Sequence, residues 1–287
     1  MPESRSVVIT GASRGLGLAS ATHLYQQGWR VVAAMRSPDA GLERLRAATG
    51  AGADDPRLLG VRLDLDDPAS IASAAKTIEE GVGAPDVLVH NAGIAAVGSV
   101  EDMPTAVWQQ IFSTNLFGPI ALTKALLPAM RAARRGRIVV ISSQGGVRGM
   151  PSISAYSASK GALERWAEAL SEEVAPFGLR VTILVTGTFK TDILTEQTTD
   201  YGDYAGPYAV HYAGIRRTGG YAVSHASPPE RFARALARSL DERAPFARHA
   251  VGVDARMLLL GARLLPGWLL HHAIRLAMRL PRHGALG

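Results

Sequence analysis

Short apolar runs alternate along the chain with longer segments in which apolar residues recur every three or four positions. A short continuous apolar run is typical of a strand covered on both faces, whereas the longer spacing is typical of a helix packed on one side. Strands are expected at Ser6–Thr10, Arg30–Ala34, Leu59–Leu63, Asp86–His90, Arg137–Ser142 and Arg180–Val185. Because strands separated by helices form right-handed crossovers, the pattern predicts an α/β protein with a doubly wound parallel sheet.

The alternation ends near Thr191. Residues 192–228 are polar and rich in Gly, Tyr and Thr, show no clear period, and carry five of the seven tyrosines. A helix is expected over Pro229–Asp241, and the letters HAVGV at 249–253 predict a short strand. These later elements are too few for a second sheet, so we expect them to extend the same domain.

The C-terminal tail is apolar over residues 254–280 but is interrupted by arginines and histidines, and Pro266-Gly267 divides it into two predicted amphipathic helices. No uncharged run approaches the roughly 20 residues of a membrane span. So much leucine and methionine must be covered by a ligand pocket, a second subunit or a membrane surface. We favour the first two, and expect a chain truncated after Val253 to keep its N-terminal ligand site.

Composition narrows the classes of function. The 287 residues are 47% hydrophobic, enough for one large core. The absence of cysteine and of metal-ligand spacing among the histidines predicts no metal. The start MPESRSVVIT lacks a signal-peptide core, so we expect a cytoplasmic location. The net charge of +6 comes from scattered arginines, which predicts no nucleic-acid partner.

The letters VVITGASRGLGLAS carry a predicted strand directly into a predicted helix, with Gly11, Gly15 and Gly17 in the turn. Glycine permits backbone angles closed to other residues, and the free N–H groups of a helix N-terminus attract a phosphate. A tight turn without a ligand also uses glycine, so the cluster alone leaves both interpretations open. The strand before it and the helix after it favour a pyrophosphate site.

The end of the second strand, VVAAMRSPDA, bears on the choice of nucleotide. A site for NAD offers a carboxylate there to the ribose 2′-hydroxyl. Here Met35 takes that place, Arg36 follows it, and Arg14 lies in the glycine turn. Two guanidinium groups suit a 2′-phosphate, although exposed arginines are common in this chain. The sequence therefore predicts NADP(H).

Two further strand ends supply small or polar residues. Asp64, after the third strand, can accept a hydrogen bond from an adenine amino group. Asn91, Ala92 and Gly93 follow the fourth strand, where small residues let a ribose lie against the backbone. A plain turn would explain each of these alone, but beside the glycine turn they favour a dinucleotide site.

A tyrosine and a lysine stand one helical turn apart in AYSASKGALERWAEAL. Free tyrosine, with a pKa near ~10, is a poor acid at neutral pH. A lysine charge about 5 Å away favours the phenolate by roughly two pKa units, so Tyr156 beside Lys160 is a candidate for proton exchange. Ser143 ends the fifth strand, and Asn115 interrupts a helical pattern; alone, Asn115 fits a side chain turned to solvent or bonded to a local carbonyl.

The motifs TGASRGLG, NAG, Asn115, Ser143 and YSASK occur in this order, and over about residues 5–191 the chain resembles the short-chain dehydrogenase/reductase family. The resemblance implies a Rossmann fold and hydride transfer between a nicotinamide and a carbonyl or alcohol. VVAAMRSPDA, GTFKTD and the long C-terminal extension are similar to the 17β-hydroxysteroid and retinol dehydrogenase branch of that family.

The resemblance also implies roles. Tyr156 would exchange the proton, Lys160 would also hold the nicotinamide ribose, Ser143 would hold the substrate oxygen and Asn115 a water. The implied cofactor-binding set is Gly11, Ser13, Arg14, Gly15, Leu16, Gly17, Arg36, Asp64, Leu65, Asn91, Ala92, Gly93, Tyr156, Lys160, Gly187, Thr188 and Thr191. One position departs from the family, because Thr186 replaces the usual proline before Gly187 and a fixed φ angle is lost.

The predicted protein is a single domain: residues 1–191 form a dinucleotide-binding and catalytic core, 192–228 a substrate lid whose tyrosines line an apolar pocket, and 229–287 a C-terminal helical extension. The expected function is that of an NADP(H)-dependent oxidoreductase acting on an apolar ketone or alcohol, as a homodimer or homotetramer. One alternative is an NADPH-sensing regulator without turnover, but the presence of Ser143, Tyr156 and Lys160 argues against it. Another is a same-fold epimerase or dehydratase, against which the glycine spacing speaks.

Overall fold

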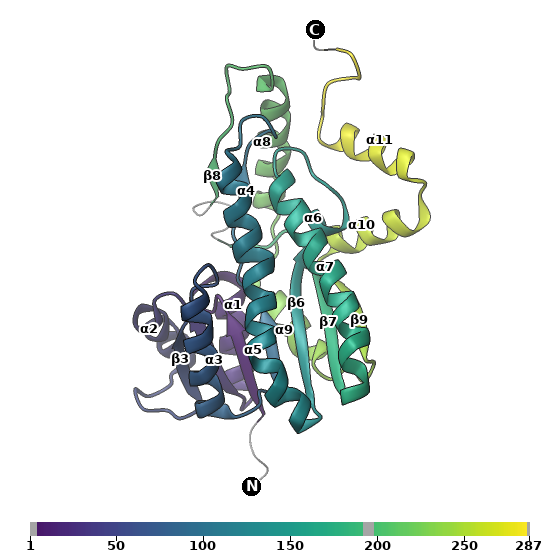
Figure 1. Cartoon of the computed structure of the whole chain (residues 1–287). Helices are drawn as coiled ribbons and strands as arrows, with labels where there is room; N and C mark the ends of the chain where they lie inside the picture. The colour runs from purple at the N-terminus through teal and green to yellow at the C-terminus, as the bar shows by residue number, and fades with distance from the viewer. Residues whose placement is uncertain (1–4, 192–197, 286–287) are drawn as a thin grey trace.

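A seven-stranded parallel sheet forms the centre of the protein (Figure 1). The computed structural model describes residues 5–191 and 198–285, so residues 192–197 of the predicted lid lie outside the described part. The strand order is β3-β2-β1-β4-β6-β7-β9. The strands are β1 (Ser6–Thr10), β2 (Arg30–Met35), β3 (Leu58–Arg62), β4 (Val87–His90), β6 (Gly136–Ser143), β7 (Leu179–Thr186) and β9 (Phe246–Val251).

The six predicted strands are confirmed, each within one residue at either end. Strand order reverses between β1 and β4, which pair directly, with Val7 opposite Val87 and Ile9 opposite Val89. The chain leaves neighbouring strands in opposite directions at such a switch point, which opens a crevice at the carboxyl ends. The glycine turn after β1 and the residues after β4 therefore meet at one edge of the sheet.

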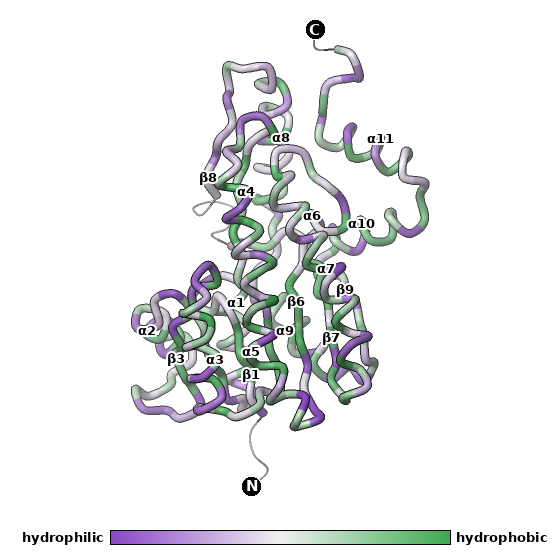
Figure 2. The backbone as a smooth tube through the Cα atoms, viewed as in Figure 1, coloured by the Kyte–Doolittle hydropathy of each residue, from purple (hydrophilic) through white to green (hydrophobic). Residues whose placement is uncertain are grey.

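Helices cover both faces of the sheet. On one face lie α1 (Gly15–Gln26), α2 (Pro38–Thr49) and α9 (Pro229–Ser239), and on the other α3 (Pro68–Val82), α5 (Gly118–Ala133) and α7 (Ser154–Val174). Successive strand residues point to opposite faces, so Val7 and Ile9 join the core under α1 whereas Val8 joins the core under α3. Figure 2 shows the resulting apolar strands at the centre of the molecule.

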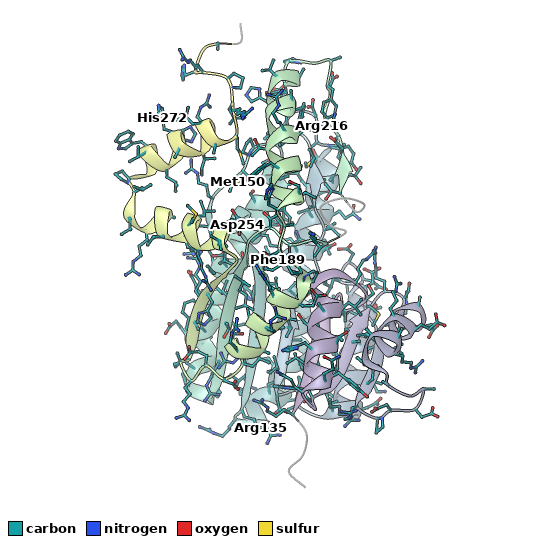
Figure 3. All side chains as sticks on the ribbon, turned by 180° about the vertical axis from the view of Figure 1, so that it is seen from behind. Arg135, Met150, Phe189, Arg216, Asp254 and His272 are labelled. Atoms are coloured by element: carbon teal, nitrogen blue, oxygen red, sulfur yellow. The ribbon has the colours of Figure 1, made fainter. Side chains whose placement is uncertain are left out.

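The remaining elements are α4 (Thr105–Phe112), the π-helix η1 (Ser113–Phe117), α6 (Gln144–Val147), the 3₁₀ turn η2 (Ala175–Phe177), α8 (Ala209–Ser224), α10 (Val253–Leu264) and α11 (Gly267–Ala277). Two short strands, β5 (Ala96–Val97) and β8 (Thr199–Asp200), pair with each other. The helices α8, α10 and α11 gather beyond the carboxyl ends of the sheet (Figure 1). Figure 3 places His272 at this end and Arg135 at the other.

Two expectations from the sequence are wrong in this region. Residues 209–224 form the helix α8. The sequence shows no helical period there because Tyr212 is the only buried residue of this helix. The last strand covers Phe246–Val251 rather than 249–253. Gly252, with φ of 115°, ends it and α10 begins at Val253. As an edge strand β9 pairs only with β7, so it needs no continuous apolar run.

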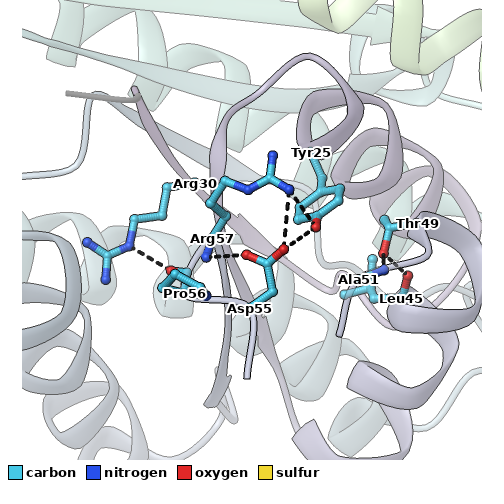
Figure 4. A network of polar contacts seen from close by, with 8 residues as sticks. All are labelled: Tyr25, Arg30, Leu45, Thr49, Ala51, Asp55, Pro56 and Arg57. Atoms are coloured by element: carbon cyan, nitrogen blue, oxygen red, sulfur yellow. Dashed lines mark hydrogen bonds and ion pairs between the residues drawn. The ribbon is translucent and has the colours of Figure 1, made fainter. Parts of the chain in front are cut away.

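A polar network at the edge of the core fastens the loop before β3 to α1 (Figure 4). The Tyr25 hydroxyl donates to the Asp55 carboxylate, and Arg57 donates to the Tyr25 oxygen at 2.7 Å. The backbone N–H of Arg57 donates to the same carboxylate at 2.8 Å. These contacts fix the path of β3, whose end supplies residues to the site described next.

Candidate active site

The turn between β1 and α1 forms the floor of a cavity of about 310 Å³, within the size range of small-molecule and cofactor sites. Gly11 and Gly15 adopt φ angles of 68° and 53°, which favour glycine. A Cβ on Gly11 would lie 2.9 Å from the Ala92 Cα, and one on Gly17 would lie 2.2 Å from the Gly11 oxygen. The glycines therefore let the turn, α1 and the chain after β4 come together.

The cavity brings together twelve of the predicted cofactor-binding residues. They are Gly11, Ser13, Arg14, Gly15, Leu16, Arg36, Asp64, Leu65, Asn91, Ala92, Gly93 and Thr191. Gly17 packs behind the turn instead, and Gly187 and Thr188 lie against the Asp254 carboxylate. Tyr156 and Lys160 lie outside the cavity lining, at the reacting end described below.

One end of the cavity is suited to phosphate. The N-terminus of α1 opens there, without a side-chain cap or an acidic residue in its first turn. Arg14 and Arg36 line this end together with Arg44 of α2, which the sequence reasoning missed. The sequence could have indicated Arg44 only through its place on the helix that follows Arg36, eight residues further along the chain. A turn without room for a Cβ at Gly11 and Gly17, an open helix N-terminus and three guanidinium groups fit the phosphates of a dinucleotide.

Asn91 holds the turn from behind. Its side-chain amide donates to the carbonyl oxygens of Thr10 at 2.9 Å and Gly11 at 3.3 Å. The Thr10 hydroxyl in turn accepts from the backbone N–H groups of Asn91 and Ala92, both at 3.1 Å. Asn91 thus fixes the spacing between β1 and β4, in addition to lining the cavity.

At the reacting end, Tyr156 of α7 lies against α6. A Cβ on Gly145 would be 3.4 Å from two atoms of the Tyr156 ring, so the ring lies directly against this glycine. Ser143 ends β6, and its hydroxyl accepts from the Gly145 N–H at 3.2 Å. Burial raises the pKa of Tyr156, and a hydrogen bond from Ser143 partly lowers it. Both hydroxyls therefore face the same small region.

Lys160 is buried, with 4% of its surface exposed. Its ammonium donates to the Ile141 carbonyl at 2.9 Å and lies 5.9 Å from the centre of the Tyr156 ring. Burial lowers the pKa of Lys160 to about 8, while nearby Glu164 raises it. The expected lowering of the Tyr156 pKa is therefore not found in the protein alone, because desolvation of the phenolate is the largest influence on it.

Asn115 is fully buried in η1, not turned to solvent. Its side chain accepts from the Ile94 N–H at 2.8 Å and donates to the Ile94 oxygen at 2.9 Å and to the Ser159 hydroxyl at 3.0 Å. π-Helical turns often occur at functional sites. The wider turn places this amide between the strand-end loop and α7.

Gly93 joins the two ends of the site. A Cβ there would lie 3.2 Å from the Asn115 Oδ1 and 3.4 Å from the Lys160 Nζ. Gly93 also lines the dinucleotide cavity. The asparagine and the lysine therefore border the cavity through the space that this glycine leaves.

The loop after β7 is held by Asp254, a residue of α10 that the sequence reasoning missed. The Asp254 carboxylate accepts from the Thr188 N–H and from the Gln144 side chain, each at 2.7 Å. A Cβ on Gly187 would lie 1.8 Å from the same carboxylate. Thr186, in place of the family's proline, continues β7 and donates its hydroxyl to the Ser142 carbonyl at 2.8 Å.

Three tyrosines of the predicted lid make polar contacts through their hydroxyls. Tyr212 is buried, donates to the Asp102 carboxylate and accepts from the Ser99 N–H at 2.6 Å. Tyr204 donates to Asp200, and Tyr208 donates to Glu101 at 2.8 Å. The bonds of Tyr212 and Tyr208 fasten the start of α8 to residues 99–102, whereas the Tyr204 bond lies within the lid segment itself.

Comparisons with known proteins agree with this geometry. A family model described as short chain dehydrogenase matches residues 5–202. Dehydrogenase/reductase SDR family member 7B of Xenopus tropicalis is 40% identical over 206 residues, which are 70% of this chain and 66% of that relative. Relatives of that name also support the narrower branch predicted from the sequence.

Solved structures extend the likeness to nearly the whole chain. A short-chain dehydrogenase from Streptomyces avermitilis is 34% identical, with a TM-score of 0.81 over 96% of this chain and 98% of that one. A structure of actinorhodin polyketide ketoreductase with NADPH is 28% identical, with a TM-score of 0.73 over 88% of this chain and 98% of that one.

Proposed function

The chain belongs to the short-chain dehydrogenase family, and from this premise we propose that it transfers a hydride between NADP(H) and a carbonyl or secondary alcohol of an apolar substrate. The observation that carries the proposal is the convergence of Ser143, Tyr156, Lys160 and Asn115 beside the cavity at the glycine turn. The fold of this family brings these residues to the carboxyl edge of the sheet, where α/β proteins bind their ligands.

The cavity residues would hold the cofactor. The turn at Gly11 and Gly15 would receive the pyrophosphate, Asp64 and Leu65 the adenine, and Ala92 and Gly93 a ribose. Thr191, beside Gly15, and Thr188, held by Asp254, would serve the carboxamide. When bound, the nicotinamide supplies or accepts the hydride.

The arginines support NADP(H) over NAD(H). Arg14, Arg36 and Arg44 line the end of the cavity beside Met35, and no carboxylate follows β2 at that place. A 2′-phosphate accepts paired hydrogen bonds from guanidinium groups. The NADPH in the related ketoreductase structure supports the same choice.

Tyr156 would donate the proton in reduction and accept it in oxidation. Because burial raises its pKa, the hydroxyl stays protonated at neutral pH and is ready to donate. Ser143 would hold the substrate oxygen while negative charge builds on it. As the phenolate forms, the buried Lys160 ammonium would stabilise it, since a charge in a site of low dielectric acts strongly.

Lys160 and Asn115 would restore the proton. Lys160 would bind the ribose hydroxyls with the N–H groups not used by Ile141. The Asn115 amide keeps the Ile94 backbone in place, and Asn115 would bind a water that connects Lys160 to solvent. A cytoplasmic location and a homo-oligomer belong to the same proposal.

A screen of ketones and alcohols that follows NADPH absorbance tests the activity. Turnover of an apolar ketone with NADPH would support the proposal. The two alternatives remain distinguishable: tight NADPH binding without turnover on any carbonyl would favour the sensing protein, and turnover of a nucleotide sugar without net change in NADPH would favour the epimerase.

Cofactor choice gives a separate prediction. Met35→Asp with Arg36→Ala should weaken NADPH binding by ten- to a hundredfold, since a hydrogen-bonded charge is worth about 1.5–3 kcal/mol, and should strengthen NADH binding. Calorimetric titration measures both affinities, with the exposed Arg238→Ala on α9 as control. Equal affinity of the unmodified protein for both cofactors would contradict the assignment.

A further inference from the structure

The helices α10 and α11 expose an unusual amount of apolar surface. Eight of the fourteen large apolar side chains that are exposed in the described residues lie here, with 39 to 77% of their surface accessible. We call them the C-terminal apolar surface: Val253, Met257, Leu260, Leu264, Leu265, Trp268, Leu269 and Leu276. The four on α10 follow the spacing i, i+4, i+7 and i+11, within roughly 60° of the helix circumference.

This surface faces away from the domain. The other side of α10 packs against α6 and β9, where Ala255 is fully buried. Arg148 and His271 are joined by a hydrogen bond of 2.7 Å, and a Cβ on Gly214 of α8 would lie 2.9 Å from the Met278 oxygen. The dinucleotide cavity contains no residue of α10 or α11. The helices are thus fixed to the domain by one side while the apolar side chains are exposed. Figure 1 shows α10 and α11 at the outside of the molecule.

The charges around this surface have one sign. Arg256, Arg263, Arg279 and Arg282 are exposed, and Asp254 is the only acidic residue in 253–285. Asp254 is turned inward to Thr188 and Gln144, so it does not neutralise them. Arg256 and Arg263 lie on α10 along one edge of the apolar stripe, as the helical spacing requires.

These charges disfavour a second copy as the covering partner. A two-fold interface brings the same patch of both subunits together, so arginines would meet arginines with no carboxylate to pair with. An anionic lipid surface offers the complementary charge and an apolar layer for the leucines. Trp268, an amphipathic ring, is the residue type enriched at the boundary between lipid and water.

We propose that α10 and α11 dock the protein on an anionic membrane surface, with the C-terminal apolar surface in the headgroup region. No helix within residues 5–191 and 198–285 is long and apolar enough to cross a membrane, so the helices lie in the plane of the surface. This differs from the sequence-based preference for a pocket or a subunit interface. Because Asp254 ties the start of α10 to Thr188, docking places the lipid beside the reacting end of the site.

Flotation of the full chain with liposomes tests the proposal. We expect co-flotation with phosphatidylcholine vesicles that contain phosphatidylglycerol, and none with pure phosphatidylcholine. Arg256→Glu with Arg263→Glu should reduce partitioning by about thirtyfold or more. The matched control is Arg231→Glu with Arg238→Glu on α9. These exposed arginines are also seven residues apart, and either pair of reversals lowers the net charge from +6 to +2.

A second pair separates the apolar contribution. Met257→Ser with Trp268→Ser should also abolish flotation, whereas Val210→Ser with Tyr221→Ser, at exposed positions on α8, should not. NADPH affinity within twofold of the unmodified protein shows that each variant is folded. The proposal is overturned if the unmodified protein does not float, if both arginine pairs weaken flotation equally, or if sedimentation shows that only an oligomer is lost.

Discussion

At the scale of the residue, burial decides the acid–base behaviour of this site. The sequence places a positive charge one turn from Tyr156, and that relation is present in the structure. The sequence cannot show how much water folding removes from these two side chains. Their desolvation raises the pKa of Tyr156 and lowers the pKa of Lys160. Arg44 was missed for a similar reason, since only the packing of α2 brings it to the cavity.

The lowered pKa of Lys160 predicts a pH dependence of cofactor binding. Lys160 is charged below about pH 8 and neutral above it, so its hydrogen bonds to the cofactor weaken as pH rises. NADPH affinity should fall by about tenfold between pH 7 and 9.5, since hydrogen bonds to charged groups exceed those to neutral groups by roughly 1–1.5 kcal/mol. Fluorescence titration of NADPH at a series of pH values measures this.

Lys160→Met is the control for this prediction. It should bind NADPH more weakly at pH 7, with an affinity that changes little up to pH 9.5. If the unmodified protein and the methionine variant lose affinity in parallel, another group is responsible.

At the scale of the element, the sequence predicted those strands and helices whose positions are set by burial in the apolar core. Buried parallel strands require apolar runs, so their positions were readable within one residue. The helix α8 was not readable, because one buried tyrosine and several hydroxyl-to-carboxylate bonds hold it rather than an apolar face. The π-helix η1 was not readable either, since its shape follows from the contacts of Asn115.

The link between α10 and the loop after β7 revises the expectation that a chain truncated after Val253 keeps an intact ligand site. Truncation removes Asp254, and with it the bonds to Thr188 and Gln144. Asp254→Asn tests the link alone. Both bonds end on the same carboxylate oxygen, so the amide can still accept them but without the negative charge that strengthens them. We expect kcat to fall by about tenfold and KM for NADPH to rise, with about 1–1.5 kcal/mol lost in unfolding free energy.

Asp86→Asn is the matched control for this change. Asp86 accepts from the Ser6 N–H at 2.8 Å and from its hydroxyl at 3.2 Å, at the end of the sheet remote from the site. It should lose similar stability in urea unfolding while kcat and KM stay near normal. Equal kinetics in the two variants would assign Asp254 a purely structural role.

At the scale of the whole molecule, the site collects residues from Thr10 to Asp254 at one edge of the sheet. The ordered motifs predicted this collection because the family's fold brings them together. The C-terminal extension carries no such motif, and its partner depends on which side chains remain exposed. Which of these side chains remain exposed is known only once the helices are packed in the folded protein.

Buried His90 predicts a loss of stability in acid. Burial lowers its pKa to about 3, with a smaller contribution from Lys160. The unfolded chain binds a proton at this residue near pH 6.5 and the folded chain does not, so stability falls as pH falls from 6.5 toward 3. The unfolding free energy should be about 2 kcal/mol lower at pH 5 than at pH 8.

Urea unfolding at the two pH values measures this effect. His90→Gln should remove most of the difference, although it lowers stability at pH 8. The exposed His272→Gln should behave as the unmodified protein does. If His90→Gln keeps the full acid sensitivity, the loss of stability comes from other groups.

The central claim is that Tyr156 transfers the proton that accompanies hydride transfer. Its most direct test is single-turnover oxidation of NADPH by Tyr156→Phe, with a ketone identified in the screen. The variant keeps the ring against Gly145 and loses only the hydroxyl. We predict a rate lower by about 10² or more with NADPH affinity within twofold of normal. A rate near that of the unmodified protein would show that another group supplies the proton.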